Sequence, residues 1–231
     1  MSPTGTPPRL RARWAALVLF AVLFILLTTE LAARHGAPYA VDRAVHRWAL
    51  EHRPPALTSG LRLLAATGTG PLPYLCAAGA GWIAGHDDRS RLRAAAYATA
   101  FLVAAQAARY ALVYSLARVR PPAADWATHA SGFAFPSGHS ATSALVAGLL
   151  ALSLCRRTGP AAHRRIRVLL GCWAVGVALS RVCLGVHWPT DILGGWLYAL
   201  IWLSAAAAWL RSGPGARPFG PATAPVRTDG R

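Results

Sequence analysis

The chain has 231 residues with 24 basic and 8 acidic side chains, a formal net charge of +16, yet only 14% of its residues are charged and 55% are hydrophobic. Soluble domains are about 25% charged, so this composition excludes an ordinary soluble globule and also an intrinsically disordered chain. The basic excess alone predicts a nucleic-acid partner. Because the longest polar stretch is the short tail after Leu210, we expect no nucleic-acid binding.

The apolar segments predict an all-α integral membrane protein. Each has about the 20 residues that a membrane-spanning helix needs, and they cover residues 14–33, about 68–85, 94–117, 138–155, 166–185 and 189–210. We therefore expect a bundle of six transmembrane helices over residues 14–210, between a cytoplasmic segment, 1–13, and a disordered cytoplasmic tail, 211–231. The second segment is the weakest, because glycines and prolines interrupt its start.

The distribution of arginine predicts the orientation of the bundle. With six spans, one side of the membrane collects most of the arginines, namely Arg9, Arg11, Arg13, Arg89, Arg91, Arg93, Arg156, Arg157, Arg164, Arg165, Arg167, Arg211, Arg217, Arg227 and Arg231. The positive-inside rule makes this side the cytoplasm, with both termini there. The first segment also resembles a signal peptide, but its apolar core is long for one, and we favour an uncleaved anchor.

A short helix is predicted between the first two spans. Apolar residues from Val41 to Ala49 recur at helical spacing, and polar residues occupy the other face. Two placements are equally compatible with this pattern: a helix lying in the outer membrane interface, and a helix packed over the bundle.

Three polar motifs stand at span boundaries on the side opposite the basic loops. The first, Arg118 to Pro121, closes the third span; the second, Pro136 to His139, opens the fourth; and the third runs from Ser180 through His187 to Asp191, between the fifth and sixth. Arginine beside an apolar helix is costly and usually functional. Arginine forks bind phosphate oxygens, and a helix N-terminus favours an anion, so the residue types indicate a phosphate site.

In this order the motifs resemble the three signatures of the type 2 phosphatidic acid phosphatase (PAP2) superfamily of integral membrane lipid phosphatases: KxxxxxxRP, PSGH and SRxxxxxHxxxD. The second and third match in full. Val113 occupies the lysine position of the first, and Arg109, one helical turn earlier on the same face, is a candidate replacement. Two other roles of Arg109 are equally compatible, namely pairing inside the bundle and snorkelling. A looser, altered substrate pocket is a further alternative. For Arg118 two roles are equally compatible: a contact at the rim of the site, and a companion of Arg120.

The resemblance implies a helical core of the PAP2/haloperoxidase type. The soluble haloperoxidases that share this site are excluded, because the apolar segments here are too long for a soluble helical protein. The resemblance assigns catalysis to His187 as nucleophile, His139 as acid and base, and Asp191 as the group that orients His187. The phosphate-binding residues that it implies are Arg120, Ser137, Gly138 and Arg181. No metal or other cofactor is expected, because the arginines supply the positive charge.

The implied function is hydrolysis of a lipid phosphate on the extracytoplasmic face of the cell membrane. Phosphatidic acid, phosphatidylglycerophosphate and polyprenyl diphosphate all fit the motifs, so the sequence leaves the substrate open, as it does the oligomeric state. Two alternatives stay open: a lipid phosphotransferase with the same site, and an inactive lipid-handling or transport bundle, which the valine at position 113 favours. For Asp125, Trp126 and His129, a solvated loop is favoured over substrate contact.

Overall fold

The computed structural model of the protein describes residues 8–210, so the predicted tail and the first part of the predicted N-terminal segment lie outside the described residues. Among residues 8–210 the secondary structure is entirely helical, which confirms the all-α prediction. The elements are α1 (Pro8–Ala33), α2 (Ala40–Glu51), α3 (Pro55–Ala66), α4 (Leu72–Ala84), α5 (Asp88–Leu116), the 3-10 helix η1 (Ala123–Asp125), α6 (Gly138–Cys155), α7 (Pro160–Cys183) and α8 (Pro189–Trp209).

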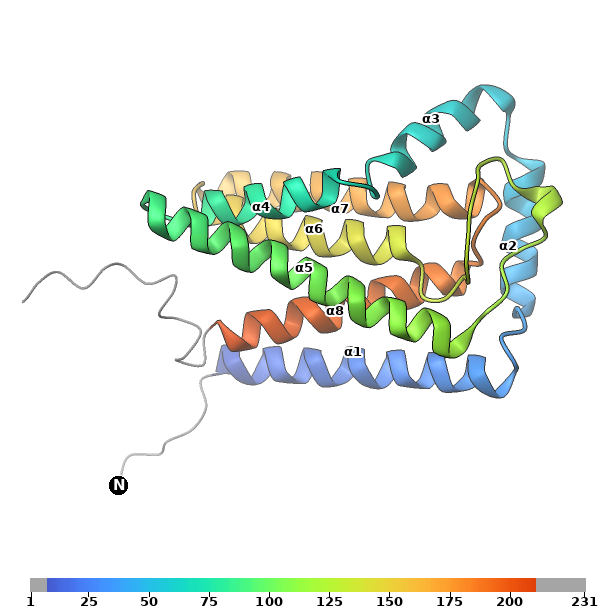
Figure 1. The fold of residues 1–231 in the computed structure, drawn as a ribbon, viewed down its shortest axis with the longest axis horizontal. Helices are drawn as coiled ribbons and strands as arrows, with labels where there is room; N and C mark the ends of the chain where they lie inside the picture. Colours follow the sequence, from blue (N-terminus) through green and yellow to red (C-terminus); the bar gives the residue numbers. More distant parts are fainter. Residues whose placement is uncertain (1–7, 211–231) are drawn as a thin grey trace, which may run out of the picture.

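The long helices form a bundle that runs along the longest axis of the molecule, while α2 crosses one end of it (Figure 1). Helix α6 packs against α4, α5, α7 and α8, and α1 packs along α8. Small residues fill these contacts, and Ala77, Ala105, Ala141 and Ala199 are fully buried. Because lipid gives no hydrophobic drive between helices, close packing of small residues is what holds such bundles together.

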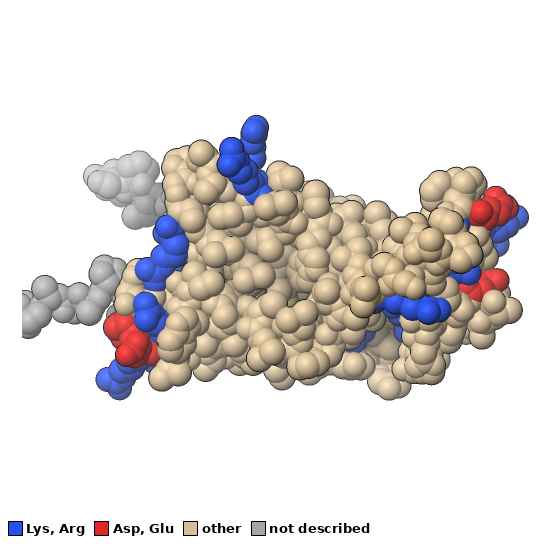
Figure 2. All heavy atoms as spheres, turned by 90° about the horizontal axis from the view of Figure 1, so that it is seen from above, with Lys and Arg blue, Asp and Glu red and all other residues tan. Residues whose placement is uncertain are grey.

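Five helices, α1, α5, α6, α7 and α8, are long and apolar enough to cross a membrane. The predicted second span is α4, which has 13 residues and a length of about 20 Å at 1.5 Å per residue. It is short because Gly70, which has a φ of 67°, and the prolines beside it separate α3 from α4. A wide band of uncharged surface lies between two charged ends (Figure 2), as expected of a protein embedded in a bilayer.

The helix boundaries explain why the motifs gather at one end. Helix α5 starts from a capping box in which Asp87 and Ser90 bind each other's backbone N–H groups, and it ends at Ala117, whose φ of 47° turns the chain. The predicted start of α6 at Gly138 is confirmed. The end of α5, the start of α6 and the turn between α7 and α8 lie at the same end of the bundle (Figure 1).

Helix α2 packs on the bundle with the opposite face from the one that an apolar pattern predicts. Asp42, His46 and Ala49 are buried, whereas Val41 and Trp48 are more than half exposed. The buried polar groups have partners: His46 Nε2 lies 2.9 Å from Asp125 Oδ2, and Asp42 pairs with Arg118. Partners far away in sequence therefore reverse the pattern, and α2 packs on α7 and α8 with apolar residues on its outer face.

Candidate active site

His187 and Asp191 form a buried pair in and beside the turn that joins α7 to α8. His187 Nδ1 lies 3.2 Å from Asp191 Oδ2, and Nε2 lies 2.9 Å from Arg120 Nη1. Because a guanidinium only donates, Nε2 accepts this hydrogen bond, and the ring proton sits on Nδ1 and is donated to Asp191. The imidazole therefore presents an unprotonated nitrogen to Arg120, which is the tautomer that a histidine nucleophile needs.

The start of α8 fixes this pair. Asp191 Oδ2 also accepts a hydrogen bond of 2.9 Å from the Trp188 backbone N–H, in a capping box. Just before it, Gly185 has a φ of 78°, and its Cα lies so close to Asp125 that a Cβ would stand 2.3 Å from the Asp125 carbonyl oxygen. Burial lowers the pKa of His187 to about 4, against the opposing effect of the hydrogen bond to Asp191.

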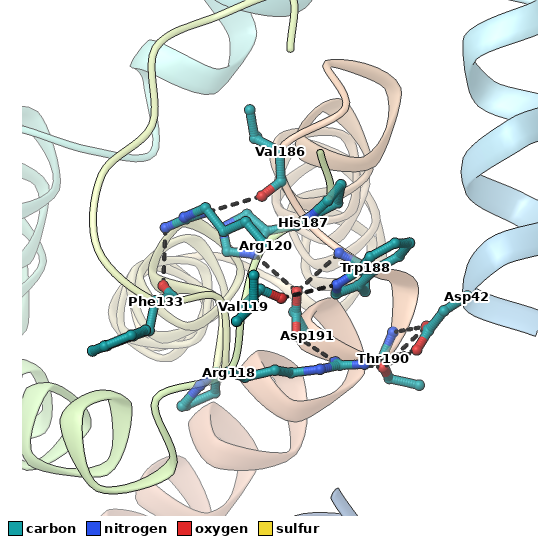
Figure 3. A network of polar contacts seen from close by, with 12 residues as sticks. Asp42, Arg118, Val119, Arg120, Phe133, Val186, His187, Trp188, Thr190 and Asp191 are labelled. Carbon is teal, nitrogen blue, oxygen red and sulfur yellow. Dashed lines mark hydrogen bonds and ion pairs between the residues drawn. The ribbon is translucent and has the colours of Figure 1, made fainter. Parts of the chain in front are cut away.

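Arg120 lies over His187 from the loop after α5 (Figure 3). Its Nη1 also donates to the Val186 carbonyl at 2.9 Å. The other donors reach carbonyl oxygens 3.0 Å away, those of Gly132, Ser131 and Phe133. Burial lowers the pKa of Arg120, and no carboxylate in the described part of the chain pairs with it. Its charge is therefore available to an anion.

The second motif places a helix N-terminus beside the pair. The Ser137 N–H donates to the Asp191 carbonyl at 3.1 Å, and the buried Ser137 Oγ has no hydrogen-bond partner. The close contact with α8 requires Gly195, where a Cβ would stand 2.8 Å from the Ser137 carbonyl oxygen. The first N–H groups of a helix have no partner within it, so this end of α6 favours an anion.

Two further arginines are buried without a carboxylate partner among residues 8–210. Arg181, on the last turn of α7, is 5% exposed, and its Nε has no hydrogen-bond partner. Arg109 Nε donates to Gln106 Oε1 at 2.7 Å, and Gln106 in turn donates to Thr142. A buried unpaired cation is costly, so both side chains are placed as if for an anion.

Arg109 lies on the inner face of α5, beside the start of α6. A Cβ on Gly138 would lie 3.1 Å from Arg109 Cζ, so the guanidinium lies directly beside the start of α6. Val113 is buried one turn further along α5. Inside the bundle Arg109 contacts neutral groups: Gln106, a carbonyl oxygen of Pro136 at 3.4 Å, and the ring of Tyr110, whose centroid lies 4.5 Å from Arg109 Cζ.

A cavity of about 650 Å³ joins these groups. Arg109, Arg120, His139 and His187 line it together, and among the described residues no carboxylate does. The predicted residues Ser137, Arg181 and Asp191 are buried and stand outside this lining, while Gly138 belongs to it. The volume is within the range of small-molecule sites. The site is thus a cationic pocket with a histidine and an arginine fork at its wall.

Arg118 does not stand at the rim of the site, and that part of the sequence-based prediction is wrong. Its side chain is fully buried and bridges two carboxylates, Asp42 at 2.9 Å and Asp191 at 2.5 Å (Figure 3). The loop prediction also changes. His129 lines the cavity, and Asp125 accepts a hydrogen bond from His46, so this loop is packed on the bundle as well as partly exposed.

Sequence reasoning missed three residues beside the site: Asp42, Gln106 and Thr142. Asp42 and Thr142 have no motif around them, and their partners stand 76 and 36 residues away in the chain. Gln106 could have been found from the sequence, because a glutamine inside an apolar span is unusual. It also lies on the same helix face as Arg109, one turn away.

Comparison with known proteins agrees with this geometry. The family model of the PAP2 superfamily matches residues 93–212, which cover the whole of α5 to α8 except the first turn of α5. The chain belongs to the PAP2 superfamily. It is also similar to a crystal structure of a transmembrane PAP2-type phosphatidylglycerolphosphate phosphatase from Bacillus subtilis, with a TM-score of 0.69 and 26% identity, covering 81% of this chain and 92% of the other.

Curated PAP2 relatives match over shorter segments. Phosphatidylglycerophosphatase B of Bacillus subtilis is 42% identical over 86 residues, which are 36% of this chain and 42% of that protein. A putative undecaprenyl-diphosphatase, YbjG, of Escherichia coli is 54% identical over 46 residues, which are 20% of this chain and 23% of the relative. The chain thus matches less than half the length of these relatives. The apolar helices and the membrane relatives identify a multi-pass membrane protein.

Proposed function

We propose that the protein is a lipid phosphatase that hydrolyses a phosphomonoester or diphosphate of a membrane lipid. The observation that carries this proposal is His187: its Nδ1 binds Asp191, its Nε2 accepts a hydrogen bond from Arg120, and its side chain lines a cavity whose described lining has cations and no carboxylate. A nucleophile that meets a bound phosphate in line, among fixed positive charges, is the arrangement that phosphoryl transfer requires.

In the first step, His187 Nε2 forms a bond to phosphorus as the bond between phosphorus and the lipid oxygen breaks. The incoming phosphate replaces the hydrogen bond between Nε2 and Arg120, and the guanidinium then binds an equatorial oxygen. Arg181, Arg109 and the N–H groups of Gly138 and His139 bind the other oxygens. The positive charge that grows on His187 is stabilised by Asp191.

His139 serves as the acid and then as the base. It stands in the wall of the same cavity as His187, where it donates a proton to the departing lipid oxygen. Water then enters, His139 accepts a proton from it, and the new hydroxide attacks phosphorus. The bond between phosphorus and nitrogen breaks, which releases inorganic phosphate and restores neutral His187.

The site faces outward in this proposal. Its motifs stand at the end of the bundle opposite to the start of α5 and the turn between α6 and α7, which carry the basic groups at Arg89 to Arg93 and Arg156 to Arg167. The positive-inside rule places those groups, and both termini, in the cytoplasm. We propose that α4, together with the interrupted segment that precedes it, forms the predicted second span and brings the number of spans to six.

The relatives motivate the substrates: phosphatidylglycerophosphate from the phosphatase similar to this chain, and a polyprenyl diphosphate from the putative diphosphatase, with phosphatidic acid as the simplest lipid phosphate. The test is phosphate release from each lipid by the purified protein, by His187→Ala and by His139→Ala. Loss of release in both variants supports the proposal, and undiminished release in either contradicts it. An acceptor alcohol added to the assay separates hydrolysis from transfer.

A further inference from the structure

Arg118 belongs to a buried cluster of charged side chains next to the site, with Asp42 and Asp191. Its Nη1 donates to Asp191 Oδ1 at 2.5 Å and to Thr190 Oγ1 at 2.7 Å, while Nη2 donates to Asp42 Oδ2 at 2.9 Å. Its Nε donates to the Gly36 carbonyl at 3.1 Å. One guanidinium therefore joins α2 to the first turn of α8, in a region where all three charged side chains are fully buried.

Asp42, like Asp191, accepts hydrogen bonds from the backbone as well as from Arg118. Its Oδ1 accepts a hydrogen bond of 3.0 Å from the Thr190 backbone N–H, and its Oδ2 accepts one of 3.1 Å from the Tyr39 N–H. Figure 3 shows Asp42 reaching Thr190 and Arg118 from the neighbouring helix. Because backbone N–H groups and a guanidinium can only donate, both carboxylates of the cluster are acceptors, as the ionised form is.

The charges of this cluster do not cancel. Arg118 alone would neutralise Asp191, since its Nη1 lies closer to Asp191 than His187 Nδ1 does, at 2.5 Å against 3.2 Å. Asp42 takes the other arm of the same guanidinium, which leaves the two carboxylates and one cation with one net negative charge. At short range inside a protein that charge acts strongly on His187.

We propose that Asp42 is a positioning residue of the active site, which shares Arg118 with Asp191 and so keeps a net negative charge behind His187. This inference rests on the proposed function, in which His187 gains positive charge when it binds phosphorus. The other charged or titratable groups that face His187 are Asp191 on α8, Arg120, Arg181 on α7 and His139 on α6. Of these only Asp191 is negative, so the charge from Asp42 has no substitute.

The test compares three proteins in a metal-free phosphate-release assay: the unmodified chain, Asp42→Asn, and the double variant Asp42→Asn with Arg118→Gln. Asp42→Asn leaves the cluster neutral and is expected to lower kcat roughly 10- to 100-fold, with KM within about threefold, as for loss of one charge-assisted contact. The double variant restores one net negative charge and is expected to be at least about threefold faster than Asp42→Asn. If the contact between Asp42 and Arg118 were merely structural, the double variant would be slower than Asp42→Asn, because it loses more hydrogen bonds.

The matched control is Glu51→Gln, an exposed carboxylate on the same helix, which is expected to keep kcat within about twofold. An unchanged kcat in Asp42→Asn, or a double variant no faster than Asp42→Asn, overturns the proposal. A second measurement needs no substrate: the His187 pKa, read by ¹⁵N NMR, should fall in Asp42→Asn and recover in the double variant. Arg118→Gln alone should raise it, which keeps the test decisive where Asp42→Asn does not fold.

Failure of the proposed function can be distinguished from failure of the role proposed for Asp42. A chain that releases no phosphate from any lipid but shows this order of His187 pKa values contradicts the proposed function and supports the charge on Asp42. A chain that releases phosphate through His187, with the His187 pKa unmoved by Asp42→Asn, contradicts only the role of Asp42.

Discussion

Substitutions at Arg109 and Val113 test whether Arg109 takes the place of the lysine in the PAP2 signature. Arg109 lies beside the start of α6, with Cζ 3.1 Å from a Cβ built on Gly138, and within residues 8–210 its hydrogen-bond partners are neutral. A charge-assisted hydrogen bond to phosphate contributes about 1.5–3 kcal/mol. Arg109→Ala should therefore lower kcat/KM about 10- to 150-fold, at about 1.4 kcal/mol per factor of ten.

The restoring change is Val113→Lys. Val113 is buried and lines the same cavity as Arg109, so a lysine there reaches the phosphate position from one turn away on α5. In the Arg109→Ala background it should recover at least about tenfold in kcat/KM. Steady-state phosphate release from mixed micelles of one lipid phosphate measures both changes. An Arg109→Ala variant within about threefold of the unmodified protein would refute the role of Arg109.

Three further predictions follow from the structure. The depressed pKa of His187, about 4, means that the unfolded state binds more protons than the folded state between about pH 6.5 and 4. Thermal stability should therefore fall as the pH is lowered from about 6.5 to 4, and less so in His187→Gln; an equal loss in both proteins would count against it. Gly194→Ala should lower the free energy of unfolding by about 1–3 kcal/mol in a denaturation series, because its Cβ would stand 2.2 Å from Phe135 Cε2. Excess chelator should leave phosphate release unchanged, since the arginines supply the positive charge, and a loss that added metal restores would contradict this.

The parts of the fold that local signals control could be predicted. Gly138 begins α6 and Pro189 begins α8 as expected, because the proline and serine signals at these points act within one helical turn. The membrane class followed from the apolar runs. For the second span the glycines and prolines at its start gave the warning, and α4 is indeed the short helix that begins at Leu72, after Gly70 and Pro71.

The parts that depend on distant partners could not be predicted. Arg118 reads as a companion of Arg120 from its spacing, yet its side chain binds partners that stand 72 to 82 residues away in the chain, namely Gly36, Asp42, Thr190 and Asp191. The same contacts turn the polar face of α2 inward. A pattern of hydrophobicity along one helix cannot show such a reversal, because the groups that pair with the buried Asp42 and His46 lie on other elements.

The most direct test of the central claim is to trap the phosphorylated enzyme. Purified protein is mixed with a lipid that carries a ³²P-labelled terminal phosphate, and the reaction is stopped in alkali, where phosphohistidine survives. The account predicts label on His187, together with loss of both label and phosphate release in His187→Ala. Phosphate release that continues in His187→Ala, or label found on another residue, would contradict it.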